Sequence, residues 1–213
     1  MTSSIADIRK DYRLRSLTEQ DADSPFQLFD RWWQEAITAQ LDEVNAMTLA
    51  TASLEGVPAA RIVLLKGFSD KGFVFYSNYN SAKGAQLAEN PRAALVFFWK
   101  ELERQVRITG LVSQTSEEDS DAYFFSRPEG SRIGAWASPQ SQVIASREWL
   151  EENELHYRER FEGSPITRPT HWGGYIVKPV TIEFWQGRAS RLHDRLQFSL
   201  QDDGEWKLDR LAP

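Results

Sequence analysis

The fold of this chain is restricted most by a succession of short apolar segments that are separated by turn signals. β-Branched and aromatic residues gather in five such segments between Ala46 and Val112, and glycine or charged residues stand between most of them. Segments of this length and composition predict β-strands, and the shortest connections predict antiparallel hairpins. The five predicted strands are Ala46–Ser53, Pro58–Phe68, Phe73–Ser77, Arg92–Trp99 and Leu102–Val112.

The C-terminal part of the chain repeats this pattern. Asp202-Asp203-Gly204 is a hairpin signal between two apolar segments, and two more apolar segments precede it. The four strands predicted here are Gly173–Val177, Val180–Gln186, Leu196–Leu200 and Trp206–Leu211. We therefore expect a mainly β protein, built as an antiparallel barrel with peripheral helices.

A helix is predicted before the first strand. Ser24 can cap a helix whose first position is Pro25, and Gln27 completes a capping box. Apolar residues spaced by three or four positions predict that one face of this helix joins the core. That predicted face consists of Phe26, Phe29, Trp33, Ile37 and Leu41.

Three more helices are predicted between the strands. They run from Ser81 to Asn90, from Ser116 to Arg127 and from Ser146 to Phe161, and serine caps mark the first two. The polar, glycine-bearing segment from Glu129 to Gln142 is predicted as a loop. Because no repeat or long linker divides the chain, we expect a flexible segment over residues 1–23 and a single domain over residues 24–213.

Composition excludes several classes of function. The 213 residues include no cysteine, which rules out disulfides, thiolate catalysis and cysteine-bound metals, and the three histidines are too scattered for a metal site. The net charge of -6 and the pI of about 5.2 argue against nucleic acid as the main partner. No apolar run reaches membrane-spanning length and the first residues lack a secretion signal, so we expect a cytoplasmic protein.

One short stretch stands out against this acidic background. Residues Glu183 to Arg195 contain three arginines, a histidine and a tryptophan. Arginine presents a planar fork of donors to phosphates and carboxylates, and tryptophan offers a flat apolar wall, so the stretch indicates an anionic, aromatic small molecule as ligand. The alternative is a strand end whose arginines pair with nearby carboxylates.

A second group of cations lies earlier in the chain. Lys83 stands in the first turn of the helix that Ser81 caps, where a cation opposes the helix dipole unless an anion binds there. This position predicts a phosphate pocket, and the alternative is an exposed lysine at a small energetic cost. In the strand Ala60–Lys66, alternation places Arg61 and Lys66 on opposite faces, where they could serve two ligands.

Seven stretches of this sequence carry a family resemblance. They are Arg61–Lys66, Val74–Asn78, Leu102–Val106, Ser126–Trp136, Phe184–Gly187, Arg191–Arg195 and the terminal Asp209–Pro213. Together they cover nearly the whole chain after about Ser24, and in this order they resemble the pyridoxine (pyridoxamine) 5'-phosphate oxidases of the FMN-binding split β-barrel family. The resemblance implies an antiparallel, Greek-key-like split barrel and a homodimer with FMN at the interface.

The resemblance also implies roles for individual residues. The implied FMN-binding residues are Arg61, Lys66, Tyr76, Ser77, Lys83, Gln105, Gln140, Ser141, Trp185 and Arg195. The implied substrate-binding residues are Lys66, Tyr123, Arg127, Ser131, Arg191, His193, Arg9 and Tyr12, of which Arg191 and His193 form the catalytic pair at the pyridine ring. The stretch Arg9–Tyr12 resembles a segment that closes over the substrate. Ala82 departs from the family, which usually has arginine there, so one contact to the FMN phosphate is expected to be missing.

The activity implied is the oxidation of pyridoxamine 5'-phosphate and pyridoxine 5'-phosphate to pyridoxal 5'-phosphate, a step of vitamin B6 biosynthesis and salvage. FMN would accept a hydride from C4' at N5, and dioxygen would reoxidise it to give hydrogen peroxide, without a metal. Two alternatives stay open: a split-barrel flavoenzyme with an unrelated substrate, and a carrier that binds flavin or pyridoxal phosphate without turnover.

Overall fold

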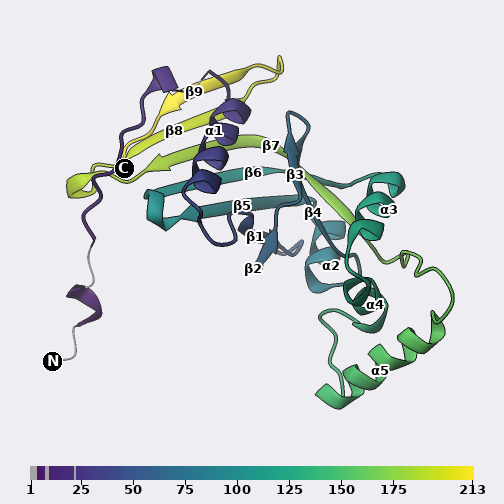
Figure 1. Cartoon of the computed structure of the whole chain (residues 1–213). Helices are drawn as coiled ribbons and strands as arrows, with labels where there is room; N and C mark the ends of the chain where they lie inside the picture. Colours follow the sequence, from purple (N-terminus) through teal and green to yellow (C-terminus); the bar gives the residue numbers. More distant parts are fainter. Residues whose placement is uncertain (1–3, 8–9, 22) are drawn as a thin grey trace. The chain divides into compact units, whose positions relative to one another are not determined.

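The computed structural model describes residues 4–7, 10–21 and 23–213 (Figure 1). Contacts among residues divide the chain into two compact units. The terminal unit comprises the chain up to Leu49 together with residues 94–110 and 179–213, and the central unit comprises residues 50–93 and 111–178. Among the described helices, none combines the length and the apolar character that a membrane crossing needs.

Nine β-strands in the described residues form a sheet with the order β2-β1-β5-β6-β7-β4-β3, and β8 pairs with both β7 and β9. The pairs β3–β4, β4–β7, β7–β8 and β8–β9 are antiparallel, and of these the hairpins β3–β4 and β8–β9 stand at predicted turns. The strands are β1 (Ala46–Ala52), β2 (Pro58–Leu64), β3 (Gly67–Ser69), β4 (Gly72–Asn78), β5 (Arg92–Trp99), β6 (Arg104–Gln114), β7 (Trp172–Gln186), β8 (Asp194–Leu200) and β9 (Trp206–Arg210).

The structure corrects two of the predicted strands. The segment predicted as one strand from Pro58 to Phe68 divides into β2 and β3, because the chain turns at residues 65–66 before it pairs with β4. Conversely, the two strands predicted on either side of Pro179 are one strand, β7. Pro179 lacks an N–H donor, and it lies between the residues that pair with β4 and those that pair with β8.

In the terminal unit, helix α1 (Pro25–Thr38) lies across strands of the sheet (Figure 1). Ser24 caps it as predicted, since its Oγ accepts a hydrogen bond of 3.2 Å from the Gln27 N–H. The predicted buried face is wrong in part: Ile37 is 48% exposed, and the buried residues of the helix are Pro25, Leu28, Phe29, Trp32 and Ala36. Ring contacts decide the orientation, because Phe29 packs on Phe97 and Trp32 packs on Phe184.

The central unit holds helices α2 (Ala82–Glu89), α3 (Glu117–Ser126), α4 (Glu129–Ala137) and α5 (Arg147–Arg160). The serine caps predicted for α2 and α3 are present. The predicted loop from Glu129 to Gln142 is wrong, because its first nine residues form α4. Burial of Ile133 and Ala135 in a cluster with Phe124, Ile166 and Trp172 outweighs the low helix propensity of the two glycines in this helix.

Candidate functional site

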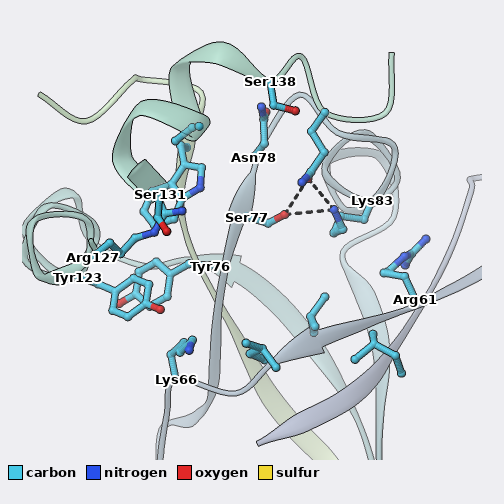
Figure 2. Close-up of a pocket in the computed structure, with 17 residues that line it drawn as sticks. Arg61, Lys66, Tyr76, Ser77, Asn78, Lys83, Tyr123, Arg127, Ser131 and Ser138 are labelled. Atoms are coloured by element: carbon cyan, nitrogen blue, oxygen red, sulfur yellow. Dashed lines mark hydrogen bonds between the residues drawn. The ribbon is translucent and has the colours of Figure 1, made fainter. Parts of the chain in front are cut away.

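A cavity of about 490 Å³ opens in the central unit, between β2, β4 and the starts of α2 and α4 (Figure 2). Four cationic side chains line it: Arg61, Lys66, Lys83 and Arg127. None of its lining residues in the described chain is an aspartate or a glutamate. A concentration of positive charge without a carboxylate, inside a chain of net charge -6, favours an anion as the ligand of this cavity.

Lys83 is held at one end of the cavity by neutral oxygen atoms. Its Nζ donates to Oε1 of Gln140 at 2.8 Å and to the hydroxyls of Ser77 and Ser81 at 3.2 Å each (Figure 2). Ser81 is fully buried and caps α2, so the free N–H groups of the first helical turn lie at the same place. Burial and then the charge of Arg61 lower the pKa of Lys83, and the negative charge of an anion bound beside it would offset both effects.

Arg61 reaches the same end of the cavity from β2. Its Nη1 donates to Oγ1 of Thr51 at 2.6 Å and its Nη2 lies 3.5 Å from Oε1 of Gln86. The Thr51 hydroxyl donates to the same Gln86 oxygen at 2.5 Å, and Thr51 is only 4% exposed. Burial lowers the pKa of the Arg61 guanidinium. Two uncharged groups, Thr51 and Gln86, thus help to orient the Arg61 guanidinium at the cavity.

Arg127 and Ser131 approach the cavity from α3 and α4, on the side opposite Arg61 and Lys83 in Figure 2. The Arg127 guanidinium carbon lies 4.4 Å from the Trp172 ring centroid, and its Nη1 is buried without a hydrogen-bond partner in the described structure. Burial lowers the pKa of this arginine. A buried N–H without a partner is costly, and a ligand oxyanion is the partner that would satisfy it best.

Between these two ends, stacked aromatic rings form one wall of the cavity. The Tyr76 and Tyr123 rings stack with centroids 3.9 Å apart, and Tyr76 stacks on Trp172 at 5.7 Å. Burial, followed by the charge of Asp119, raises the pKa of Tyr76, so its phenol stays protonated. Lys66 lies over the Tyr123 ring at 5.9 Å. The cavity thus combines two separate groups of cations with a flat apolar surface that suits a ligand ring.

The terminal unit contains a second group of predicted site residues. The Trp185 and His193 rings lie 4.6 Å apart, and the Tyr12 ring packs edge-on against both, at 5.7 Å and 5.9 Å. The backbone N–H of Arg188 donates to Nδ1 of His193 at 3.1 Å. An N–H can donate only to an unprotonated imidazole nitrogen, so the neutral ring carries its proton on Nε2. Burial, and then the charge of Arg191, lower the pKa of His193 and favour this neutral form.

The arginines of this stretch have different surroundings. Arg188 pairs with Asp194 at 3.3 Å, and Arg195 makes two hydrogen bonds to the buried Glu183, at 2.9 Å and 3.1 Å. The alternative of arginines paired with carboxylates therefore holds for these two. Arg191 is exposed and has a left-handed backbone with φ of 62°, next to Ser190 at φ of 56°. Two such residues cost about 1–2 kcal/mol each, and strain of this kind clusters at functional sites.

The structure distributes the predicted site residues between the two units. Those that line the cavity are Arg61, Lys66, Tyr76, Ser77, Lys83, Tyr123, Arg127, Ser131 and Gln140. Those in the terminal unit are Tyr12, Gln105, Trp185, Arg191, His193 and Arg195. Ser141 follows Gln140 with φ of 71° and does not line the cavity, and Arg9 lies outside the described residues. The prediction that Arg61 and Lys66 serve opposite faces is wrong, because β2 ends at Leu64 and both residues line one cavity.

Sequence reasoning missed three residues that shape the cavity. Thr51 and Gln86 orient Arg61, and Trp172 stacks with Tyr76 and Arg127. A polar residue at a buried position of β1 was the available signal for Thr51. Gln86 and Trp172 carried no such signal, since their roles depend on the approach of segments far apart in the chain.

Two protein-family models match this chain. The one described as pyridoxamine 5'-phosphate oxidase matches residues 33–154, and the one described as the pyridoxine 5'-phosphate oxidase C-terminal dimerisation region matches residues 172–213. A relative from Trichormus variabilis is 57% identical over 100% of both chains. A relative from Cupriavidus necator is 56% identical over 98% of this chain and 99% of its own. Both relatives are named pyridoxine/pyridoxamine 5'-phosphate oxidase.

Solved structures show the same fold. PhzG from Burkholderia lata, in complex with tetrahydrophenazine-1-carboxylic acid, has a TM-score of 0.87 and 30% identity, over 94% of this chain and 99% of its own. An FMN-binding, pyridoxamine 5'-phosphate oxidase-related protein from Nostoc punctiforme has a TM-score of 0.70 and 20% identity, over 89% and 98%. The predicted split barrel, mainly antiparallel with peripheral helices, is confirmed.

Proposed function

This chain belongs to the pyridoxamine 5'-phosphate oxidase family, and on that premise we propose that it oxidises pyridoxamine 5'-phosphate and pyridoxine 5'-phosphate to pyridoxal 5'-phosphate with FMN as cofactor. The observation that carries the proposal is the cavity of the central unit, where four cations and no carboxylate face one space. An enzyme of this kind holds two phosphate monoesters, one of FMN and one of the substrate. The cations at the two ends of the cavity supply a group for each.

The end of the cavity around Lys83 fits the phosphate of FMN. Lys83 and Arg61 supply charge, the Ser77 hydroxyl supplies a donor, and the N–H groups at the start of α2 favour an anion. Lys83 now donates to the neutral oxygens of Ser77 and Gln140, and phosphate oxygens can replace them as acceptors. Since these partners carry no charge, they would not repel the phosphate. The other residues proposed to hold FMN are Lys66, Tyr76, Gln105, Gln140, Ser141, Trp185 and Arg195.

The end around Arg127 fits the phosphate of the substrate. The unpartnered Nη1 of Arg127 supports this assignment, because a phosphate oxygen would satisfy it with a charge-assisted hydrogen bond. Ser131, in the first turn of α4, adds a hydroxyl. Lys66 and Tyr123, which also line the cavity, complete the proposed phosphate site.

Arg191 and His193 are proposed to orient the pyridine ring and to assist loss of the proton from the C4' substituent. The tautomer of His193 limits its role, since Nδ1 is occupied by the Arg188 N–H and the neutral ring presents Nε2–H as a donor. His193 then acts by donating a hydrogen bond to the substrate. Arg9 and Tyr12 are the remaining proposed substrate contacts, and residues 1–23 are proposed as a flexible cover of the single domain over 24–213.

When bound, FMN supplies the oxidation itself, by accepting a hydride from C4' at N5 and passing the electrons to dioxygen, which leaves as hydrogen peroxide. With the amine substrate, water hydrolyses the imine product, so each turnover consumes one dioxygen and one water and releases one ammonia. The match to the dimerisation region supports a homodimer, and we place FMN at its interface, in a cytoplasmic enzyme.

Oxygen uptake tests the proposal directly. We expect the purified protein, loaded with FMN, to consume dioxygen when pyridoxamine 5'-phosphate is added and to release pyridoxal 5'-phosphate and hydrogen peroxide in equal amounts. Pyridoxamine without its phosphate is the matched control, and it should react far more slowly at equal concentration. A protein that binds FMN and the phosphorylated amine but consumes no dioxygen would be a carrier, and the oxidase proposal would fail.

A further inference from the structure

Glu103, at the start of β6, is a buried acid in an unusual conformation. The residue is 3% exposed and has a left-handed backbone, with φ of 55° and ψ of 41°. A non-glycine residue in this region costs about 1–2 kcal/mol, and a buried carboxylate needs partners. The surroundings of Glu103 therefore have to compensate for both its backbone and its charge.

The partners of the Glu103 carboxylate come from the N-terminal segment of the same unit. Its Oε2 accepts hydrogen bonds from the backbone N–H groups of Arg13 at 2.9 Å and Leu14 at 3.1 Å. Its Oε1 lies 3.5 Å from Nζ of Lys10. One carboxylate thus holds three residues of an otherwise exposed stretch, and the two backbone bonds fix the path of the chain through residues 10–14.

The backbone of Glu103 binds the end of β7. Its carbonyl oxygen accepts from the Gly187 N–H at 2.7 Å and from Nε2 of Gln186 at 3.2 Å. Gly187 is also the surface on which Tyr12 rests, because a Cβ placed on Gly187 would lie 2.7 Å from Cγ of Tyr12. Glu103 and Gly187 together make a seat that holds the Tyr12 ring against Trp185 and His193.

We propose that Glu103 is a positioning residue: it fastens the segment Lys10–Leu14 so that Tyr12 forms one wall of the site at Trp185 and His193. The seat itself follows from contacts within the terminal unit. Its effect on catalysis rests on the proposed function, in which the substrate ring binds at His193. Without the carboxylate, Tyr12 loses its fixed place and the substrate ring loses a wall.

Limited proteolysis tests the seat without reference to activity. Glu103→Asn keeps a residue that tolerates the left-handed backbone but cannot reach Arg13 and Leu14. Trypsin cleavage after Arg13, followed by intact mass, should be at least about tenfold faster in Glu103→Asn than in the wild type, because local opening exposes this peptide bond. Glu103→Gln retains an acceptor oxygen and should fall between the two. Glu101→Gln, at an exposed position two residues away, is the control and should match the wild type.

Kinetics test the positioning role, with FMN affinity measured separately on the apoprotein. Glu103→Asn should raise the KM for pyridoxamine 5'-phosphate by about tenfold with a much smaller change in the Kd for FMN, since the proposed FMN phosphate site at Arg61 and Lys83 is untouched and Trp185 keeps its contact with His193. Gly187→Ala retains the carboxylate group but places a Cβ 2.7 Å from Cγ of Tyr12 and 3.0 Å from Cβ of Glu103, so it should disturb the seat and raise KM as well. Tyr12→Ala should raise KM as well, and adding Glu103→Asn to it should change KM little further.

Each outcome decides a different point. If trypsin cleaved Glu103→Asn after Arg13 at the wild-type rate, the proposal that Glu103 fastens this segment would be wrong, whatever the oxidase activity. Faster proteolysis with an unchanged KM in Glu103→Asn, Gly187→Ala and Tyr12→Ala would overturn the positioning role and leave the proposed function standing. If the wild-type protein showed no oxidase activity, only the proposed function would be contradicted. If Glu103→Asn does not fold, Gly187→Ala decides by the same two measurements.

Discussion

The cavity of the central unit and the arginine-rich stretch of the terminal unit both contain several cationic side chains, but the partners of those cations differ. In the cavity, Arg61 and Lys83 are held by hydroxyl and amide oxygens, and no carboxylate of the described chain lines the space. In the terminal unit, Arg188 and Arg195 are held by the carboxylates of Asp194 and Glu183. A cation held by neutral groups keeps its charge for a ligand, whereas a cation held by an acid is largely neutralised.

This contrast reverses the ranking that cation density along the sequence suggests. The stretch from Glu183 to Arg195 gathers three arginines in thirteen residues, yet two of them pair with carboxylates of the same stretch. Arg61, Lys66, Lys83 and Arg127 are scattered along the chain and meet only in the folded protein. The type of partner, acid or neutral oxygen, therefore distinguishes a structural cation from a binding cation.

The largest expected effect concerns the arginines that are paired with carboxylates in the terminal unit. Glu183→Gln removes the charge that pairs with Arg195 and Arg107, and leaves two cations beside a buried neutral side chain. We expect the free energy of unfolding to fall by about 2–3 kcal/mol, below the range for a fully buried pair, because Glu183 is buried but both arginines are partly exposed. Urea denaturation at pH 7 and a fixed protein concentration measures it, with the exposed Glu159→Gln as control. A loss below about 0.5 kcal/mol would show that these arginines do not depend on Glu183.

The next effect concerns the binding side. Arg127→Ala removes the guanidinium whose Nη1 is buried without a partner in the described structure. A charge-assisted hydrogen bond is worth about 1.5–3 kcal/mol, so the KM for pyridoxamine 5'-phosphate should rise by roughly tenfold to a hundredfold. The exposed Arg147, which pairs with Glu151, gives the matched control Arg147→Ala. An unchanged KM would require another site for the substrate phosphate.

Exchanging one neutral partner for an acid should convert a binding cation into a neutralised one. Gln86→Glu puts a carboxylate 3.5 Å or less from the Arg61 guanidinium with almost no change in shape. We expect FMN to bind about tenfold more weakly, a loss of about 1.4 kcal/mol, while the protein stays as stable or becomes more stable. Titration of the apoprotein with FMN measures the affinity, and Gln201→Glu in an exposed turn is the control. If the affinity stayed the same, the charge state of Arg61 would not matter for the cofactor.

Much of the fold could be predicted because it depends on local patterns. The strand positions follow from β-branched segments and turn residues, and the caps at Ser24, Ser81 and Ser116 follow from adjacent residues. Helix α4 could not, because its glycines favour a loop locally and its stability comes from burial of Ile133. The orientation of α1 escaped prediction for the same reason, since Phe97 and Phe184 decide which face is buried.

The site was predictable where a local pattern or a family motif supplied its residues: the helix start after Ser81 indicated Lys83, and the strand Ala60–Lys66 indicated Arg61, before any motif was considered. Those motifs named Arg61, Lys83 and Arg127, which the structure brings to one cavity. They did not show that Arg195 makes hydrogen bonds to a buried carboxylate, that of Glu183. Which side chain reaches each guanidinium depends on strand pairing. Arg195 of β8 lies directly opposite Trp185 of β7, and Glu183 stands two positions along the same strand. Partner identity is a property of the folded chain.

A smaller effect is expected at Ala82, where the family usually has arginine. Ala82 is exposed at the first position of α2, and two arginines that might have compensated, Arg107 and Arg188, pair with carboxylates. Ala82→Arg should lower the Kd for FMN by about threefold to tenfold, because an exposed charge near phosphate is partly screened. Ala88→Arg, exposed near the other end of the helix, is the control. Equal or weaker binding in Ala82→Arg would mean that the phosphate contact is already supplied.

The smallest effect probes how Arg191 acts on its neighbour. Burial lowers the pKa of His193 most, the charge of Arg191 lowers it further, and Asp194 opposes both. Protonation would remove the Nδ1 acceptor of the Arg188 N–H, so turnover should fall as the pH drops through the pKa of His193. Arg191→Ala removes only the second contribution. The pKa of His193 should therefore rise but stay below the ordinary imidazole value, because burial, the largest contribution, is unchanged.

Nuclear magnetic resonance titration of labelled apoprotein measures the pKa of His193 in the wild type and in Arg191→Ala, with the His156 resonance as an internal reference. In Arg191→Ala the acid limb of the pH–rate profile should move to higher pH together with the His193 titration, since both report the same proton. FMN should stay bound in this variant while turnover falls. If the acid limb of the pH–rate profile did not move with the His193 titration, a group other than His193 would cause that limb. A pKa that fell would mean that Arg191 does not act on the ring through its charge, and that this exposed arginine is not a counterpart of the cations in the cavity.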